Sequence, residues 1–449
     1  MNSINKLAVL VAGVTLYGTC AAADDTDKAR CLAYQDISQA EACLRATDHS
    51  LGRLTLGQSG EYEIRETPSS IVGDYAEFFD GDLTAIRSPL LIKALENDGK
   101  ALVVRVGAPD PVTGEYAVKL STKDDGQKNY RGAILASNHG SEITGKEILS
   151  WYNRARLGNG YAFVSSLTHG ISDLREVSKG GKYEAAFFGL EKASSLGLFE
   201  VQYLYSLNEP GGESKIYELA GETNRLSIAS THWLTPGLSV NNQLSFTHKK
   251  QDFGAFNLTE SQNYGMYRPK ATYSNGSSSA SLTISKGLGG KQDYNLIPLM
   301  GTFNPDFWSA QLDGSTRIIL DDGVGVSLNL SAFSGSQDMP ASERFRLGGE
   351  GAGSSHENGI FSGYEGFSYD ISMMKNLGLY YGVHMSGKAG FNGAKVTTAT
   401  DHKLAINAFQ TGLSARYGNF SLDAAWSKSV STRELDADSR ITLDLAWHY

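Results

Sequence analysis

The residue types that could support chemistry gather in one glycine-rich run near the end of the chain. The segment Gly348-Gly-Glu-Gly-Ala-Gly353 has the small residues that let a backbone wrap around a phosphate. A phosphate loop also needs a helix directly after it, because the N–H groups at the start of the helix bind the anion. No helical pattern follows Gly353, so the sequence does not predict a phosphate site here.

Other catalytic and metal-binding signatures are missing. The chain has no G-x-S-x-G elbow, P-loop, H-E-x-x-H or C-x-x-C. The nine histidines are scattered, and we expect them to be surface or interior polar residues rather than ligands. We therefore expect no enzyme activity, no cofactor and no metal site. A lipase whose serine and histidine lie far apart in the sequence stays open, because no short motif would reveal it.

The N-terminus predicts export. Lys6 precedes the apolar run Leu7–Tyr17, and Ala21-Ala-Ala23 forms an A-x-A cleavage site, so residues 1–23 are expected to be a signal peptide. A lipoprotein signal at Cys20 is the alternative, although Tyr17 and Thr19 suit it poorly.

Residues 24–50 are expected to be helical, because Ile37, Ala40 and Leu44 recur at helical spacing. Cleavage leaves two cysteines in this segment, Cys31 and Cys43, and two cysteines in an exported chain predict one disulfide. The alternative is that both are small buried residues of a helix.

Composition excludes two broad classes. The chain has 449 residues and a net charge of −9 without any block of like charges, which gives no support to nucleic-acid binding. No apolar stretch after the N-terminus approaches the length of a membrane-spanning helix.

Residues 51–123 predict a small α/β domain with the order strand, two helices, two strands. The expected helices are Ser69–Phe79 and a second one from Asp82, which Pro89 should kink or split. The expected strands are Gly52–Leu56, Ala101–Val106 and Gly114–Ser121.

Residues 124–449 predict a transmembrane β-barrel of about 16 antiparallel strands, each about 9–13 residues long, which is long enough to cross a bilayer at a tilt. Apolar and polar residues alternate: Leu282 and Ile284 oppose Ser281, Thr283 and Ser285. A soluble sandwich would also alternate, but its strands are shorter, and here Tyr, Trp and Phe gather at the strand ends. Such a sheet must close on itself, because lipid offers no hydrogen-bond partners.

A long loop, residues 335–365, separates the strand that contains Val324–Ser331 from the strand Phe367–Met373. Hairpin loops usually have 2–5 residues, so a loop of this length is expected to be either functional or unstructured.

Several segments resemble one known family. Leu83–Leu95 and Gly114–Leu120 are similar to parts of a POTRA domain, and Ser137–Gly145 is similar to a first barrel hairpin. Ser342-Glu-Arg-Phe-Arg-Leu-Gly-Gly349 and Ser362–Phe367 are similar to a late-barrel loop motif. In this order the segments resemble the outer-membrane transporters of two-partner secretion, which export haemolysins and adhesins.

The resemblance implies a location, partners and sites. It places the chain in the outer membrane of a Gram-negative bacterium, inserted by the barrel assembly machinery, with the POTRA-like domain in the periplasm. It implies export of one large secreted protein, an adhesin, cytolysin or toxin. That partner would bind a sheet edge of the POTRA-like domain at Leu102, Val104, Val106, Tyr116 and Val118. The implied loop motif comprises Arg346, Leu347, Gly348, Gly349, Glu350, Gly363 and Gly366.

The chain also departs from the family. The family's loop tip carries an arginine that pairs with an aspartate on a following strand. Here the tip is Ala352-Gly-Ser-Ser355, and the matching strand Tyr380–Gly390 has no acidic residue. The loop would then be held by Glu350, His356 or Glu357, or would not be held. There is also room for one POTRA module where relatives have two.

Two other functions stay open: a passive porin or solute channel, and an outer-membrane protein insertase of the same superfamily. A porin would not need residues 51–123, and an insertase usually has more POTRA modules.

Overall fold

The computed structural model describes residues 51–56, 62–66, 75, 78, 88–109, 116–141, 145–171, 181–296, 298, 300–320 and 323–449. The predicted signal peptide, the segment 24–50 with Cys31 and Cys43, and most of the predicted helix 69–79 lie outside these residues. The chain divides into an N-terminal unit, which also takes in residues 156–162 and 192–197, and a barrel unit. None of the helices in the described part is long and apolar enough to span a membrane.

The N-terminal unit contains one antiparallel sheet and one described helix, α4 (Pro89–Asp98). The described helix begins at Pro89, and Ser88 before it is extended, so no continuous helix passes through this proline; residues 82–87 lie outside the described residues. A proline suits the first helical position, because its missing N–H would have no partner there. The helix buries one face, as the spacing predicts, through Leu90, Leu91, Ala94 and Leu95.

The strands of this sheet follow the order β2-β1-β4-β3, with bounds β1 (Leu51–Leu56), β2 (Tyr62–Glu66), β3 (Lys100–Pro109) and β4 (Tyr116–Asp124). Among the described strands β3 is therefore an edge strand, and Leu102, Val104 and Val106 lie on it. The expectation that Tyr116 and Val118 lie at an edge is wrong. β4 pairs with β1 on one side and β3 on the other, so neither side of its main chain is free.

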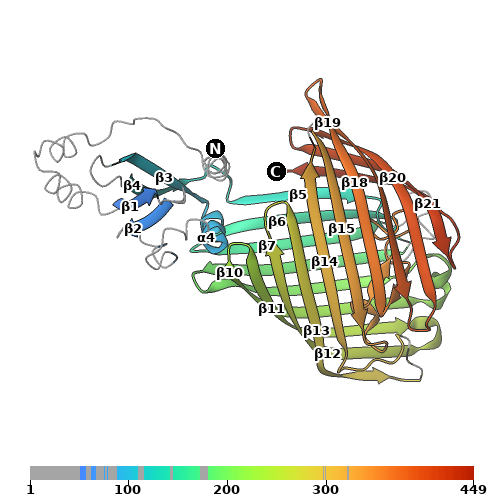
Figure 1. Cartoon of the computed structure of the whole chain (residues 1–449). Coiled ribbons are helices and arrows are strands. Elements are labelled where there is room, and N and C mark those ends of the chain that lie inside the picture. Colours follow the sequence, from blue (N-terminus) through green and yellow to red (C-terminus); the bar gives the residue numbers. More distant parts are fainter. Residues whose placement is uncertain are drawn as a thin grey trace, which may run out of the picture. The chain divides into compact units, whose positions relative to one another are not determined.

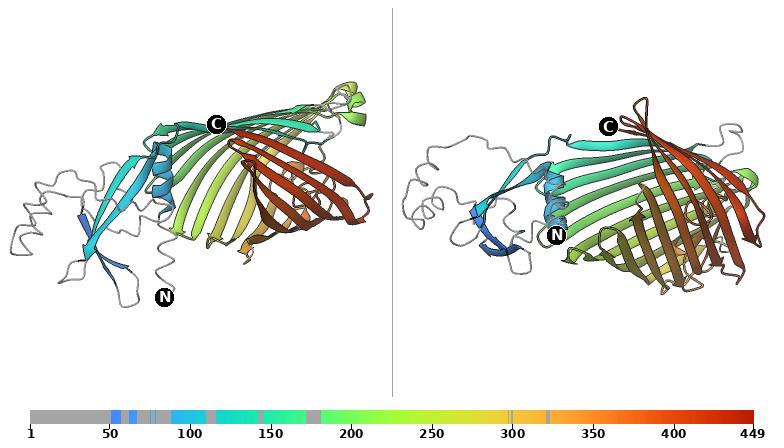
Figure 2. Two further views of the ribbon diagram at one scale, coloured as in Figure 1. Left: turned by 90° about the horizontal axis from the view of Figure 1, so that it is seen from above. Right: turned by 45° about the horizontal axis from the view of Figure 1, so that its top comes forward.

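Sixteen described strands close into one antiparallel barrel, which confirms the predicted fold (Figures 1 and 2). Each strand pairs with its neighbours in sequence, and β22 pairs with β5 to close the wall. The strands are β5 (Tyr130–Ser137), β6 (Glu147–Gly158), β7 (Tyr161–Ile171), β8 (Lys182–Ser194), β9 (Gly197–Glu209), β10 (Leu219–Thr235), β11 (Leu238–Phe253), β12 (Leu258–Ser274), β13 (Ser278–Tyr294), β14 (Trp308–Ile319), β15 (Val324–Gly335), β18 (Glu365–Tyr380), β19 (Val383–Thr397), β20 (Lys403–Tyr417), β21 (Phe420–Arg433) and β22 (Ser439–His448).

Several strands are longer than predicted: β10, β12 and β13 each have 17 residues. The prediction followed the alternation of apolar and polar residues, which is needed only where a strand faces lipid on one side. Beyond the lipid both faces are wet, so the strand continues while the alternation stops.

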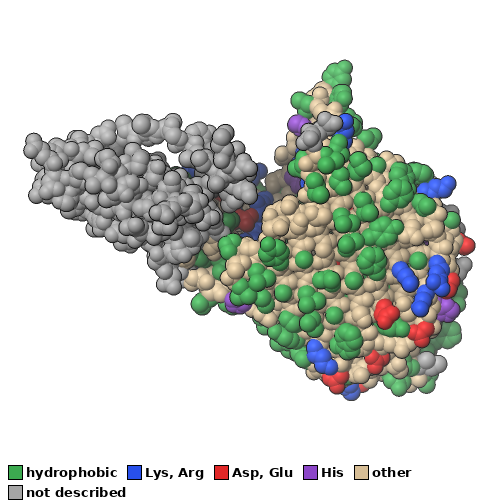
Figure 3. Space-filling model, in the orientation of Figure 1, with side chains coloured by type: hydrophobic (Ala, Val, Ile, Leu, Met, Phe, Trp, Pro, Cys, Tyr) green, Lys and Arg blue, Asp and Glu red, His purple; other side chains and the backbone are tan. Residues whose placement is uncertain are grey.

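The barrel wall separates an apolar exterior from a polar interior. On β11 the side chain of Phe246 is exposed on the wall, whereas its neighbours Ser245 and Thr247 are buried. Leu282 and Ile284 on β13 are likewise exposed, as the alternation predicts. Figure 3 shows hydrophobic side chains spread over the visible wall, with charged side chains gathered toward its lower right rim. Exposure of this apolar exterior to water would be unfavourable, whereas the acyl chains of a bilayer would cover it.

The two ends of the barrel differ. At one end the connections are short: β6 ends at Gly158 and β7 begins at Tyr161, and β18 ends at Tyr380 and β19 begins at Val383. At the other end they include the segments 295–307 and 336–364. Exposed aromatic side chains border both ends, as girdles at the two membrane interfaces would: Tyr273, Tyr417 and Phe420 near the short turns, and Tyr294, Trp308 and Phe367 near the long connections.

Candidate functional site

The connection between β15 and β18, residues 336–364, folds back against the inner face of the barrel wall. It contains a short helical turn, η5 (Ala341–Glu343), and a two-stranded sheet of β16 (Phe345–Leu347) and β17 (Phe361–Gly363). We call this segment the inner loop. Its structure answers the question that the sequence left open, because the loop is ordered and is held at several points.

The predicted motif residues form the tight turns of the inner loop. Gly348 has φ +95°, and a Cβ there would meet the Glu357 carbonyl oxygen at 2.2 Å. At Gly363 a Cβ would meet the Thr397 carbonyl oxygen at 2.0 Å. A larger residue at Gly363 would therefore push the loop away from the wall, and one at Gly348 would distort the loop itself. Leu347 is fully buried and packs against the wall with Val396, Leu404 and Ile406.

The base of the inner loop, residues 336–347, is held by an ion cluster. The Glu343 carboxylate accepts hydrogen bonds from Arg225 on β10 and from Arg268 on β12, the latter at 2.6 Å. The Tyr264 hydroxyl donates to the same carboxylate at 3.1 Å. Only 4% of the Glu343 side chain is exposed, so these bonds are shielded from water.

Two opposing effects set the pKa of Glu343. Burial penalises the charged carboxylate, but the positive charges of Arg225 and Arg268 outweigh burial and hold the pKa below its ordinary value of 4.5. Glu343 is therefore ionised at neutral pH. Its charge joins the inner loop to two wall strands at once.

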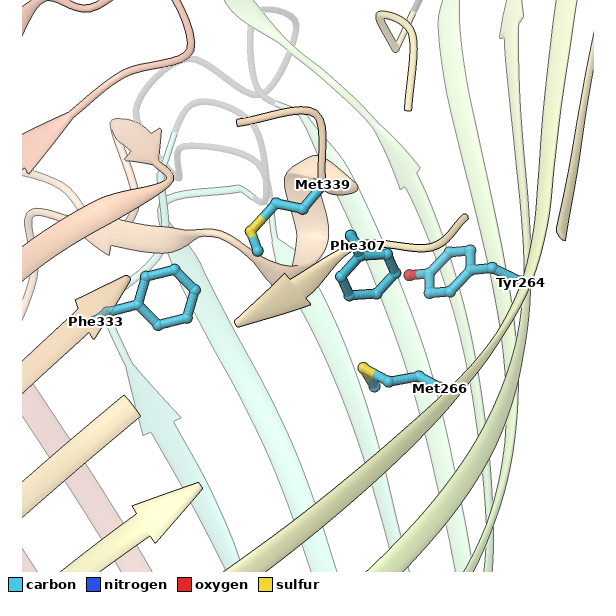
Figure 4. Close-up of a cluster of buried hydrophobic side chains, with 5 residues drawn as sticks. All are labelled: Tyr264, Met266, Phe307, Phe333 and Met339. Atoms are coloured by element: carbon cyan, nitrogen blue, oxygen red, sulfur yellow. The ribbon is translucent and has the colours of Figure 1, made fainter. Parts of the chain in front are cut away.

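An apolar cluster holds the base from a second side. Met339 of the inner loop packs with Phe307, and Tyr264, Met266 and Phe333 from the wall complete the cluster (Figure 4). Phe307 belongs to the connection between β13 and β14, so this connection also folds inward. The main-chain N–H of Asn304 donates to the Asp338 carbonyl oxygen at 2.9 Å and joins the two connections directly.

The β13–β14 connection has an anchor of its own. Glu260 on β12 is fully buried, and its carboxylate accepts the main-chain N–H of Met300 at 2.6 Å and the side-chain amide of Gln292. That this second connection also folds inward was not predicted from the sequence. Its one available signal was the pair Phe303 and Phe307 within a long connection, which is unusual where a loop faces only water.

The tip of the inner loop, residues 350–357, is held mainly by hydrogen bonds between neutral groups. The Asn392 side-chain oxygen on β19 accepts the main-chain N–H groups of Gly353 and Ser354 at 3.3 and 2.9 Å. The Asn392 amide donates to the Ser354 hydroxyl at 2.9 Å, and the Ser427 hydroxyl on β21 donates to the Ser354 carbonyl oxygen at 2.7 Å. An amide thus holds the tip where the resemblance implied an ion pair.

Asn392 lies two residues beyond the strand Tyr380–Gly390 that the sequence analysis searched for an acidic partner. It lies on the same strand as Ser386 and Lys388, six and four residues further along, and even spacings place residues on one face of a strand. Extending the strand would have found it.

Buried His356 also contributes, because its ring bonds the Ser355 hydroxyl at 2.9 Å and the Asp436 carbonyl oxygen at 3.0 Å. Arg440 on β22 donates to the His356 carbonyl oxygen at 3.3 Å. Of the three holding residues that the sequence suggested, His356 is thus well placed. Glu350 makes only a partly exposed ion pair with Lys388 at 3.7 Å. Arg346, a predicted motif residue, lies exposed on β16.

This arrangement holds a folded segment of chain against the inner face of the wall. The described residues contain no group of three or more His, Cys, Asp or Glu side chains placed to bind a metal ion. The polar lumen contains a folded loop, with a buried carboxylate and two arginines at its base and mainly neutral hydrogen bonds at its tip.

Comparison with solved structures confirms the fold. The chain is similar to CdiB from Acinetobacter baumannii, with a TM-score of 0.62 and 13% identity over 92% of this chain and 81% of that one. It is similar to CdiB from Escherichia coli, with a TM-score of 0.64 and 14% identity over 96% and 89%. BamA from Haemophilus ducreyi lacking POTRA domains 1–3 gives a TM-score of 0.56 and 9% identity over 92% of each chain. No protein-family model and no curated protein matches the chain.

The resemblance stated from the sequence is thus confirmed at the level of the fold.

Proposed function

We propose that this chain is an outer-membrane channel that exports a dedicated partner protein by two-partner secretion. The observation that carries the proposal is the inner loop: a closed barrel has a polar lumen, and a folded segment held by breakable contacts occupies it. The chain shares its fold with CdiB from Acinetobacter baumannii and from Escherichia coli, and its motifs resemble those of two-partner secretion transporters. A passive porin is less well supported, because the loop obstructs its path.

The unequal connections support an orientation. Outer-membrane barrels have short periplasmic turns and longer extracellular loops. The short turns, such as the one between Gly158 and Tyr161, would then face the periplasm, together with the N-terminal unit. This orientation would let the N-terminal unit meet a partner before it enters the barrel.

The edge strand β3 is the proposed capture site. An edge strand has main-chain N–H and C=O groups that a partner segment can pair with, which gives affinity without a fixed sequence. Leu102, Val104 and Val106 lie on this strand. β4 is not a candidate, because β1 and β3 already pair with its two edges.

Export itself would be non-enzymatic. The partner would pass as an extended chain once the tip of the inner loop moves aside, and partner folding outside the cell would supply the driving force. This step requires no cofactor and no metal.

Deleting residues 51–123 tests the proposal. With the product of the neighbouring open reading frame co-expressed, the deletion should stop secretion, because the capture strand is gone. The remaining barrel should still be heat-modifiable on gels, which shows that it folds. Unchanged secretion would contradict export through capture. Loss of assembly of other outer-membrane proteins would point to an insertase.

Proline substitutions separate capture from sheet stability. Neighbouring N–H groups of an edge strand point alternately to the partner strand and to the free side. Of Val103→Pro and Val104→Pro, the variant that removes a free N–H should lose export while its N-terminal unit keeps its resistance to protease. The other variant should lose both. Full export by both variants would exclude β3 as the capture strand.

A further inference from the structure

The lumen contains a cavity that the inner loop does not fill. It has a volume of ≈ 880 Å³ and lies between the loop tip at Glu350–Ala352 and the inner faces of β12–β15, β18 and β19. Part of its lining flanks the short turns: Thr272 lies two residues before the end of β12, and Ser279 lies at the start of β13. A chain that enters from the short-turn end would therefore meet this cavity before it meets the loop tip.

The lining is rich in hydroxyl groups. Ser279 and Ser315 lie 2.7 Å apart through their hydroxyl oxygens, as do Ser327 and Ser372. A hydroxyl group can both donate and accept a hydrogen bond. Rows of hydroxyls on neighbouring strands can therefore pair with the N–H or the C=O groups of a passing main chain in any register.

The charges of the lining balance. Three cationic side chains (Lys270, Arg317 and Lys388) stand beside three carboxylates (Asp313, Glu350 and Asp370). Asp313 is already bonded to the Ser331 hydroxyl at 2.7 Å and to the Gln311 amide at 2.8 Å. The cavity thus gives no net attraction to either sign of charge. Burying an additional charge there would cost desolvation without a matching partner.

The lining also lacks aromatic rings. A flat ring surface is what would favour stacking of a ligand on the wall. An apolar segment would bury hydroxyl groups without hydrogen bonds, which is unfavourable. The balanced charges, the hydroxyl groups and the lack of aromatic rings in this lining favour one class of occupant, a segment whose own groups are polar and uncharged.

We infer that this cavity is a binding site for an extended, uncharged polypeptide segment rich in serine, asparagine and glycine. The site recognises main-chain groups and small polar side chains, and it holds the segment before the loop tip moves. This inference rests on the proposed function, because it assigns the cavity to the exported partner. It adds the chemical class of the segment and the wall that binds it.

Photo-crosslinking to the full-length purified chain tests this site. The variant Ser315→benzoylphenylalanine places a photoreactive group in the cavity. The probe is a synthetic twenty-residue peptide of serine, asparagine and glycine, compared with two versions in which the serines become lysine or glutamate. We expect the neutral peptide to crosslink at the lowest concentration and the two charged peptides to be about equally weak.

Two double variants then test the wall. Ser327→Ala with Ser372→Ala removes a cross-strand hydroxyl pair of the cavity. Ser227→Ala with Ser245→Ala removes a cross-strand serine pair on the β10–β11 wall and is the matched control. Two lost hydrogen bonds should weaken crosslinking of the neutral peptide about tenfold in the first variant and leave it unchanged in the second.

Several results would overturn the inference. These are equal effects of the two double variants, no effect of either, or stronger crosslinking of a charged peptide. The assay needs no exported partner, so its result is independent of secretion. If the deletion of residues 51–123 leaves secretion intact, the proposed function fails on its own evidence.

Discussion

The base and the tip of the inner loop are held in different ways. At the base the Glu343 carboxylate bonds two arginines from separate strands, and Met339 lies in an apolar cluster. At the tip most contacts are neutral: Asn392, Ser427 and His356 exchange hydrogen bonds with short polar side chains and the main chain, and the ion pair of Glu350 with Lys388 is exposed. Both regions touch the same wall, but the energies of their contacts differ.

If the loop moves, as the proposed function requires, this difference predicts which part moves. Breaking a buried ion pair by removing one partner costs about 3–5 kcal/mol, whereas an average hydrogen bond contributes about 0.5–1.5 kcal/mol. Neutral hydrogen bonds can also be exchanged for bonds to a passing polypeptide with little loss. Under the proposed function we therefore expect the tip to move aside during export while the base stays in place as a hinge.

The largest effect should come from Glu343→Gln. The change leaves the partly buried Arg225 and Arg268 beside a neutral amide, so the base should lose up to about 3 kcal/mol of stabilisation. We expect a large rise in single-channel conductance in planar bilayers and faster protease cleavage of the loop. Glu350→Gln is the matched control on the same loop. Its ion pair is exposed, so its effect should stay below about 1 kcal/mol. Equal effects of the two variants would refute the distinct role of the base.

Phe307→Ala should come next. Removing the ring empties the centre of the apolar cluster and should destabilise the base by about 3 kcal/mol. Because the inner loop would then leave the wall more easily, we expect more frequent channel openings. We also expect the loop to unfold at a lower temperature. Phe256→Ala removes an exposed ring from another connection and should change neither quantity. A silent Phe307→Ala would mean that the β13–β14 connection does not support the inner loop.

Asn392→Ala should have a smaller effect that is confined to the tip. It leaves the N–H groups of Gly353 and Ser354 without their acceptor, at a cost of about 1–3 kcal/mol. Hydrogen exchange should accelerate at residues 352–356 and stay slow at residues 341–347. Asn407→Ala on the neighbouring strand β20 removes an amide that bonds Tyr369 and Ser431, and should leave the loop unchanged. Faster exchange at both ends of the loop would show that base and tip open as one unit.

Acid should release the base only at low pH. Because the pKa of Glu343 is lowered, its ionic stabilisation is fully present above the ordinary value of 4.5 and is lost as the pH falls through the lowered pKa. Conductance should therefore be flat from neutral pH down to about 4.5 and rise below it. Glu343→Gln should remove this acid-dependent rise. A rise that begins near pH 6 would assign the change to a histidine instead.

Much of the fold could be predicted because its pattern is local. Alternation such as Leu282 and Ile284 against Ser281 and Ser285 follows directly from the two sides of a strand in a wall between lipid and water. The motif glycines were found for the same reason: Gly348 needs a backbone conformation that larger residues rarely adopt. Strand ends were predicted less well, because the alternation stops at the edge of the lipid.

The contacts of the inner loop could not be predicted in the same way. Glu343 lies 118 residues from Arg225 and 75 residues from Arg268 along the chain. Nothing local to Glu343 reveals which arginines face it, because this depends on the strand order and on the closure of the barrel. The sheet edge is a second example, since only the pairing of β4 with both β1 and β3 showed that Tyr116 and Val118 are not free.

The sequence by itself thus determined the barrel, its lipid-facing residues and the presence of a long glycine-rich loop. The tertiary structure alone decided that this loop folds inward, that Glu343 holds its base and Asn392 its tip, and that a hydroxyl-lined cavity remains beside it. The physical reason is that period-two alternation depends on neighbours along the chain. An ion cluster and a cavity depend instead on strands that meet only when the sheet closes.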